Sequence, residues 1–214
     1  MELLTRPYDP AQADVRVEFG FARLEHAFRA ANRATADQWA ATAEILAEAR
    51  RHPEVFVDPG ARLRTAERVE FAERAAAADI AVRLGLSEST VRAHAFDAET
   101  LRRRLPQVWA AFHEGEVVVA NARCAAELVR TLPDHPRLNA AFDEQLARLT
   151  GLTPTRFRRR ARVLRERLHD VPLTERVKSA TETRDVWLDD DVDGMAHLTV
   201  RLDAVSAHRA FARI

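Results

Sequence analysis

The sequence predicts a mainly α-helical protein, a multi-helix bundle that contains a helix-turn-helix-like corner and carries a small C-terminal β-hairpin. Three observations support this prediction. Apolar residues recur at helical spacing along most of the 214 residues, prolines and glycines separate these runs, and strict alternation begins only near the C-terminus. A chain of this length can bury a sizeable core.

Two helices are expected at the N-terminus. The first covers residues 10–31, where apolar side chains follow one helical face. Thr35 is expected to cap the second, and the proline-containing stretch 52–60 follows as a linker. We therefore expect residues 1–60 to form a helical hairpin and linker, ahead of a helical domain over residues 61–182.

The segment over residues 79–105 has the spacing of a helix-turn-helix. Gly85 stands where the turn needs a left-handed backbone, and Ser87 is a good N-cap for the second helix. That helix would present Ser89 and Arg92 outward as candidate DNA contacts. Because a glutamate offsets its one outward arginine, a helical corner inside a bundle is the favoured alternative to insertion into a DNA groove.

The rest of the chain continues this order. Further helices are expected over residues 63–84, 87–105, 107–114, 117–131, 137–150, 154–169 and 173–180. Residues 186–188 and 196–202 alternate like two strands, and Gly194 suits the turn between them. We expect residues 183–214 to form this hairpin and the start of a helix. Since the chain ends inside that helical pattern, we expect either a fragment or a truncated protein.

Four stretches resemble the motifs of one bacterial family, in the same order. They are residues 105–117 (LPQVWAAFHEGEV), 152–159 (LTPTRFRR), 184–188 (RDVWL) and 193–198 (DGMAHL). The family is domain of unknown function 222, also called the 13E12 repeat family, and the resemblance covers roughly residues 62–214. In that family the domain is commonly followed by an HNH endonuclease domain, so the resemblance implies a nuclease-associated role.

No catalytic or metal-binding residue is predicted in this chain. An HNH site needs histidines that hold a divalent metal and activate water, whereas the eight histidines here are scattered singly. The acidic turn 189–194 imitates the start of a calcium loop, but Val200 stands where the loop needs glutamate. A divalent metal would therefore belong to the HNH domain, and we expect no cofactor and no small-molecule substrate here.

The strongest local charge lies between Thr155 and Arg167, with seven arginines and one acid. An apolar stripe that includes Phe157 and Leu164 forces the arginines onto the other helical faces. The candidate phosphate contacts are Arg156, Arg158, Arg159, Arg162 and Arg165. In the alternative interpretation acids neutralise this helix, and the formal net charge of zero favours it. The candidate acids are Glu99, Asp143, Glu144 and Asp189.

The composition favours one cellular location and is compatible with three functions. The single Cys124 excludes an internal disulfide and is expected to be a buried structural thiol. With no secretory segment and no long apolar run, we expect a cytoplasmic protein away from membranes. The preferred function is a non-catalytic domain that helps an HNH nuclease engage double-stranded DNA. The alternatives are a helical protein-interaction or scaffolding module and an enzyme in its own right.

Overall fold

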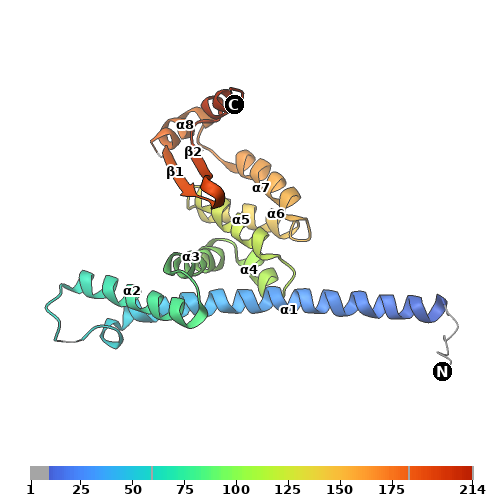
Figure 1. Ribbon diagram of the computed structural model, residues 1–214, viewed down its shortest axis with the longest axis horizontal. Helices are drawn as coiled ribbons and strands as arrows, with labels where there is room; N and C mark the ends of the chain where they lie inside the picture. The colour runs from blue at the N-terminus through green and yellow to red at the C-terminus, as the bar shows by residue number, and fades with distance from the viewer. Residues whose placement is uncertain (1–9, 59, 183, 214) are drawn as a thin grey trace. The chain divides into compact units, whose positions relative to one another are not determined.

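The computed structural model describes residues 10–58, 60–182 and 184–213. These residues are mostly α-helical and form two compact units, Met1–Leu168 and His169–Ile214 (Figure 1). The predicted mainly α fold with a C-terminal β-hairpin is therefore confirmed.

The first unit holds α1 to α7. Their bounds are α1 (Pro10–Arg51), α2 (Thr65–Leu84), α3 (Glu88–Arg104), α4 (Pro106–His113), α5 (Val119–Arg130), α6 (Pro136–Ala147) and α7 (Pro154–Leu168). From α2 to α7 the bounds follow the sequence-based expectation closely. α3 is the central helix, because it contacts α1, α2, α4, α5 and α6.

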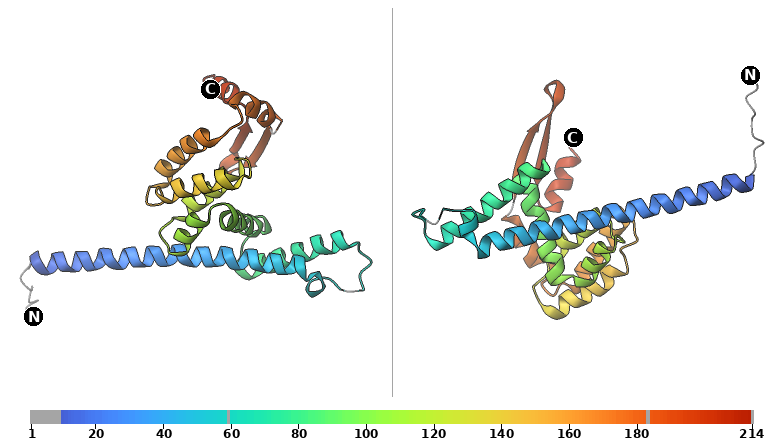
Figure 2. Two further views of the ribbon diagram at one scale, coloured as in Figure 1. Left: turned by 180° about the vertical axis from the view of Figure 1, so that it is seen from behind. Right: turned by 90° about the horizontal axis from the view of Figure 1, so that it is seen from below.

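The predicted N-terminal helical hairpin is wrong, because α1 is one continuous helix (Figure 2). Thr35 does not cap a new helix. Its hydroxyl donates to the carbonyl oxygen of Ala31 at 2.9 Å, one turn back inside the same helix. No proline or glycine follows Gly20 within α1, and the alanine-rich sequence sustains the helix. The domain boundaries predicted at residues 60 and 182 stay predictions.

Aromatic side chains from three helices form the centre of the core. Trp39 of α1 is fully buried, and its ring stacks on His94 of α3 with 5.1 Å between ring centroids. Phe112 of α4 meets Trp39 edge-on at 5.3 Å. Each large ring buried in this way removes a large apolar area from water, so these contacts stabilise the packing of α1 against α3 and α4.

The corner between α2 and α3 has the predicted local geometry. Gly85 adopts a left-handed conformation with φ of 65°, and the N–H of Leu86 donates to the carbonyl oxygen of Ala81 at 3.0 Å. The hydroxyl of Ser87 accepts a hydrogen bond from the N–H of Thr90 at 3.1 Å. The turn is therefore fixed by its own backbone and cap, independently of any partner.

α4 ends in direct contact with α1. Gly115 has a φ of 79°, and a Cβ at this position would lie 2.3 Å from the carbonyl oxygen of Arg29. The carbonyl oxygen of Gly115 also accepts a hydrogen bond from the amide of Asn32 at 3.3 Å. Only glycine fits this approach, so the packed part of α1 begins near Arg29.

The second unit contains α8 (Leu173–Thr181), β1 (Asp185–Asp190), β2 (Ala196–Arg201) and α9 (Ala204–Phe211). β1 and β2 are antiparallel, with Trp187 opposite Thr199. Asp193 and Gly194 both take positive φ in the connecting turn, as the turn prediction requires of Gly194. Within the described residues, every side chain of both strands is exposed.

Candidate nucleic-acid interface

α7 packs through one apolar face. Phe157, Ala161 and Leu164 are buried against α5 and α6, and this face sets the orientation of the whole helix. The arginines of α7 consequently occupy its remaining faces, as the sequence predicts.

The start of α7 is anchored by a buried amide of α5. The side-chain N–H₂ of Asn121 donates to the carbonyl oxygens of Thr150 at 3.3 Å and Leu152 at 2.9 Å. These carbonyls belong to the loop that leads into Pro154, the first residue of α7. The helix that carries the arginines is therefore held firmly against α5.

Six arginines of α7 form an exposed cationic surface, which we call the arginine ridge. Its members are Arg156, Arg158, Arg159, Arg160, Arg162 and Arg167. Over the described ranges of the chain, none of these six guanidinium groups forms an ion pair with a carboxylate. The ridge therefore concentrates positive charge without a matching acid, in a chain whose formal net charge is zero.

Arg165 has a different environment. Its side chain is only 16% exposed, forms an ion pair with Glu166, and donates from Nε to the hydroxyl of Thr131 at 2.7 Å. Arg165 thus ties α7 to the end of α5. Among the described residues, it is the one of the five arginines predicted as phosphate contacts that forms an ion pair with a carboxylate.

Three of the acids proposed to neutralise the ridge have other partners. Glu99 pairs with Arg50 at 2.5 Å, and Glu144 pairs with Arg148 at 2.5 Å. Asp143 is buried and accepts hydrogen bonds from two backbone N–H groups at the start of α4. These acids do not neutralise α7, so that interpretation is wrong for Glu99, Asp143 and Glu144.

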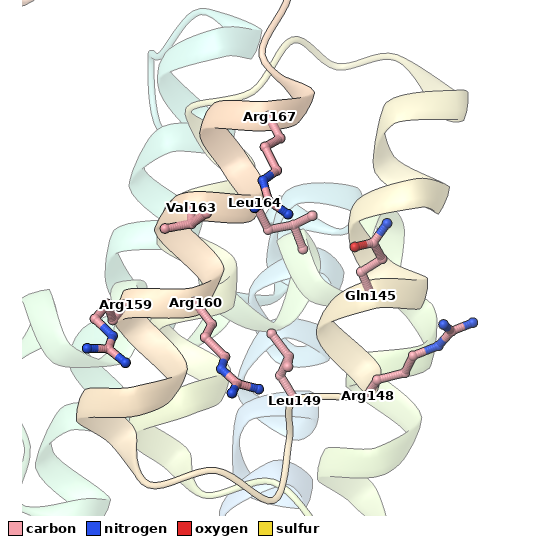
Figure 3. A pocket seen from close by; sticks show the side chains of 8 residues that line it. All are labelled: Gln145, Arg148, Leu149, Arg159, Arg160, Val163, Leu164 and Arg167. Carbon is pink, nitrogen blue, oxygen red and sulfur yellow. The ribbon is translucent and has the colours of Figure 1, made fainter.

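A groove lies on each side of the exposed crest of α7. The groove toward α6, of about 620 Å³, has an apolar floor that includes Leu149 and Leu164 (Figure 3). Its rim carries Gln145 and the guanidinium groups of Arg148, Arg159, Arg160 and Arg167. The groove toward α5, of about 590 Å³, is lined by Arg158, Arg159 and Arg162 among others. Arg159 and Val163 line both grooves and form the crest between them.

Ser89 and Arg92 lie apart from the ridge, at the start of α3. The Ser89 hydroxyl is hydrogen-bonded to that of Ser87 at 2.8 Å, and Arg92 lies 3.7 Å from the Glu88 carboxylate. α5 contacts both α3 and α7, so it separates these two sets of predicted residues. Although α3 is also the central helix of the unit, Ser89 and Arg92 lie on its exposed face.

Cys124 is buried in α5, as predicted for a structural thiol. Burial raises the pKa of its thiol, and the nearby Arg158 guanidinium opposes this shift. Across the residues whose placement is described, no three His, Cys, Asp or Glu side chains gather closely enough to hold a metal ion. In the same part of the chain, no helix combines the length and the apolar character needed to cross a membrane.

The sequence analysis missed the contribution of α6 to the site. Gln145 and Arg148 lie one helical turn apart, and Arg148 also carries the ion pair with Glu144. Their spacing marks a shared helical face, which is the one available signal. Nothing local shows that this face borders α7, because that depends on how the two helices pack.

The fold and the ridge define a helical domain that presents a cationic helix, α7, whose ridge arginines pair with none of the described carboxylates. Residues 24–214 match the family described as Domain of unknown function (DUF222). Since the match covers most of the chain, this protein belongs to that family, as its motifs predicted. No curated protein and no solved structure matches the chain.

Proposed function

We propose that this chain is a non-catalytic domain that engages double-stranded DNA through the arginine ridge. In members of the family that carry an HNH endonuclease domain, it would act ahead of that domain in the bacterial cytoplasm, and the HNH domain would supply the divalent metal and the hydrolysis. The observation that supports the proposal is the absence of ion pairs between the described carboxylates and the six ridge arginines.

The chemistry of the ridge suits a row of phosphates. Guanidinium groups form short, charge-assisted hydrogen bonds with phosphate oxygens. Arg156, Arg159 and Arg162 follow one another at three-residue intervals, so they share the side of α7 away from its buried face. Each arginine that reaches a phosphate also releases a condensed counterion. Binding should therefore depend weakly on sequence and strongly on salt.

Fluorescence anisotropy with a short labelled duplex tests this proposal. With about four phosphate contacts, the association constant should fall ~100-fold between about 50 and 200 mM salt. The ridge variant Arg156→Glu/Arg159→Glu/Arg162→Glu should lose most of its binding at low salt. None of these three side chains is buried, so the variant should keep its fold.

A matched control changes the net charge by the same amount at a different place. It replaces three exposed arginines before α3 by glutamate: Arg62, Arg74 and Arg83. This control should bind duplex DNA within about threefold of the parent chain, because long-range charge effects are screened over about 10 Å at these salt concentrations. Equal losses in both variants would show a general charge effect and would refute a ridge-specific interface.

Two further results would contradict parts of the proposed function. If the full chain shows no binding at low salt, DNA engagement is wrong and the helical interaction module becomes the better description. If the chain alone nicks plasmid in the presence of a divalent metal, the proposed division of labour with an HNH domain is wrong. We expect salt-dependent binding and no nicking.

A further inference from the structure

The N-terminal half of α1 carries an apolar stripe that no other described part of the chain covers. Its members are Val17, Phe21, Leu24 and Phe28, at helical intervals of four, three and four residues. Their exposed fractions are 52%, 55%, 65% and 54%. Soluble monomers rarely expose a contiguous row of large apolar side chains, and such a row marks an interaction surface.

This stripe continues a face of α1 that is already used for packing. Further along the helix, the same face buries Asn32, Ala36, Trp39, Ala43 and Leu46 against the chain's own core. The packed region begins near Arg29, where Gly115 meets the helix. N-terminal to this point the apolar pattern persists, but the covering helices stop.

We propose that the stripe pairs with the same stripe of a second copy as an antiparallel two-helix interface. The spacing is symmetric about the midpoint between residues 22 and 23. An antiparallel pair centred there places Val17 against Phe28 of the second copy and Phe21 against Leu24 of the second copy. Each layer then joins a larger and a smaller side chain, which keeps the helix separation even.

The flanks of the stripe favour this arrangement. On one flank, Gly20 and Ala27 carry little or no side chain, so the two backbones can approach closely. On the other flank, Arg29 of the second copy comes near Asp14 and Glu18, which gives opposite charges at both ends of the interface. In a parallel pair, α1 of the second copy would have to run along the same face beyond Asn32. There each α1 is already covered by the core of its own chain.

The interface is modest in size. Residues 14–31 span about 27 Å of helix. Two such helices bury on the order of 1,000 Å², which is near the lower limit for a specific interface. We therefore expect a reversible dimer with a dissociation constant in the micromolar range, and this expectation is independent of DNA binding.

Sedimentation equilibrium on the full chain tests the proposal, with two single substitutions as a matched pair. Leu24 lies in the stripe and Phe19 lies on the opposite side of α1, and each is 65% exposed. Leu24→Glu should weaken the dimer at least ~30-fold, because it places a charge in an apolar layer. Phe19→Glu should leave the dimer unchanged within about twofold.

A second substitution tests the register through charge. Near the centre of the antiparallel pair, Glu18 of each copy faces Glu25 of the other. Glu25→Gln should therefore tighten the dimer about two- to fivefold, since like-charge neighbours cost a few tenths of a kcal/mol per pair. A weaker dimer in this variant would contradict the register.

Disulfide trapping tests the orientation in a Cys124→Ala background. A mixture of Val17→Cys and Phe28→Cys chains should form the mixed disulfide. Val17→Cys alone should not crosslink, because antiparallel helices separate the two Val17 positions by about 16 Å along the axis, beyond disulfide reach.

Three results would overturn the proposal. They are a monomer at every concentration, a dimer that Leu24→Glu leaves intact, and efficient crosslinking of Val17→Cys to itself. A monomer that binds anionic vesicles and loses that binding in Leu24→Glu would assign the stripe to a lipid surface instead.

Discussion

α3 and α7 are both rich in arginine, but their neighbours use the guanidinium groups in opposite ways. In the last turn of α3, Arg102 pairs with Glu44 at 3.4 Å and Arg103 pairs with Asp134 at 2.9 Å. Along α7, the six arginines of the ridge have no carboxylate partner among the described residues. One helix uses its cations to hold the fold, and the other displays them.

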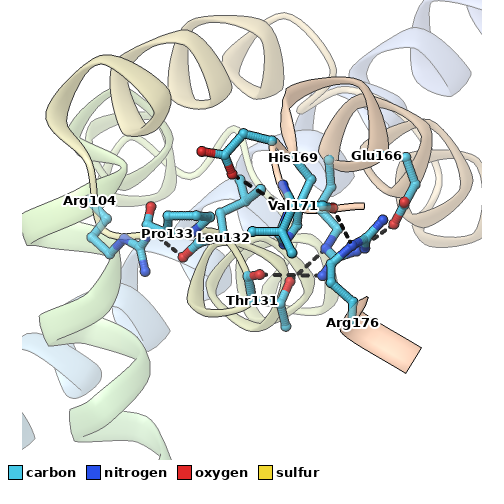
Figure 4. A network of polar contacts seen from close by, with 10 residues as sticks. Arg104, Thr131, Leu132, Pro133, Glu166, His169, Val171 and Arg176 are labelled. Carbon is cyan, nitrogen blue, oxygen red and sulfur yellow. Dashed lines mark hydrogen bonds and ion pairs between the residues drawn. The ribbon is translucent and has the colours of Figure 1, made fainter. Parts of the chain in front are cut away.

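Arg104 shows the structural use most clearly. Its side chain is 5% exposed, and its guanidinium donates to the carbonyl oxygens of Leu132 and Pro133, each at 3.1 Å (Figure 4). It also donates to Oδ1 of Asn139 at 2.8 Å. Burial lowers the pKa of the Arg104 guanidinium, and Asp134 opposes that shift. This one side chain fixes the loop between α5 and α6, on which the position of α6 beside the ridge depends.

The difference shows why the net charge of this protein is a poor guide to the charge of any one surface. The chain has 33 basic and 33 acidic residues, which alone would argue against attraction to nucleic acid. Folding distributes these charges unevenly, because the acids around α3 and α4 are already engaged in the bundle. A neutral chain can therefore present a strongly cationic surface.

The largest expected effect is a difference in the free energy of unfolding between an arginine variant of α3 and one of α7. Arg104→Ala should lower the free energy of unfolding by about 3 kcal/mol, because it leaves several buried acceptors without a donor. Arg159→Ala should change it by less than ~0.5 kcal/mol, since the side chain is exposed and no described carboxylate forms an ion pair with it. Urea denaturation followed by circular dichroism measures both. Equal stabilities would show that the contacts of Arg104 contribute nothing.

A somewhat smaller effect is expected where an acid is used inside the bundle. Asp143 accepts hydrogen bonds from the N–H groups of Gln107 at 2.8 Å and Val108 at 3.0 Å. Asp143→Ala would leave both N–H groups at the start of α4 without an acceptor. We expect the free energy of unfolding to fall by about 2 kcal/mol. Asp143→Asn keeps one acceptor and should cost less. If Ala and Asn cost the same in urea denaturation, the carboxylate does not cap α4.

Local rules were sufficient for much of the fold. The left-handed Gly85, the Ser87 cap, the start of α7 at Pro154 and the turn at Gly194 each follow from a residue whose conformational preference decides the local geometry. Thr35 shows where such rules fail. A threonine hydroxyl can cap a helix or donate to a carbonyl one turn back, and the surrounding helix formers decide between these outcomes.

The site was predicted in part, because it depends on tertiary packing. The sequence shows that α7 is basic and amphipathic, so the ridge could be placed on one helix. It does not show that Thr131 and Glu166 contact Arg165, or that Gln145 of α6 and Arg148 directly after α6 border the groove. It also does not separate Ser89 and Arg92 from the ridge, since that separation depends on α5 packing between α3 and α7.

The smallest expected effect is a pH dependence of the free energy of unfolding. It comes from Asp143, which is bonded to the start of α4, and not from the arginine ridge of α7. Burial raises the pKa of the Asp143 carboxyl, and the two N–H groups at the start of α4 only partly oppose the shift. The folded protein therefore takes up this proton at a higher pH than the unfolded chain does. Stability from this group should rise as the pH falls through the folded pKa toward the ordinary aspartate pKa.

The Asp143→Asn variant isolates this contribution, because it lacks the titrating group but keeps the side-chain shape. The free energy of unfolding of the parent chain, minus that of the variant, should increase on acidification over that window. Urea denaturation at several pH values measures this difference. The six ridge arginines have no carboxylate partner among the described residues, so Arg159→Ala should show no such change relative to the parent chain. A difference that shrinks on acidification would mean that the two N–H groups outweigh burial at Asp143, and that this acid is held in its charged form.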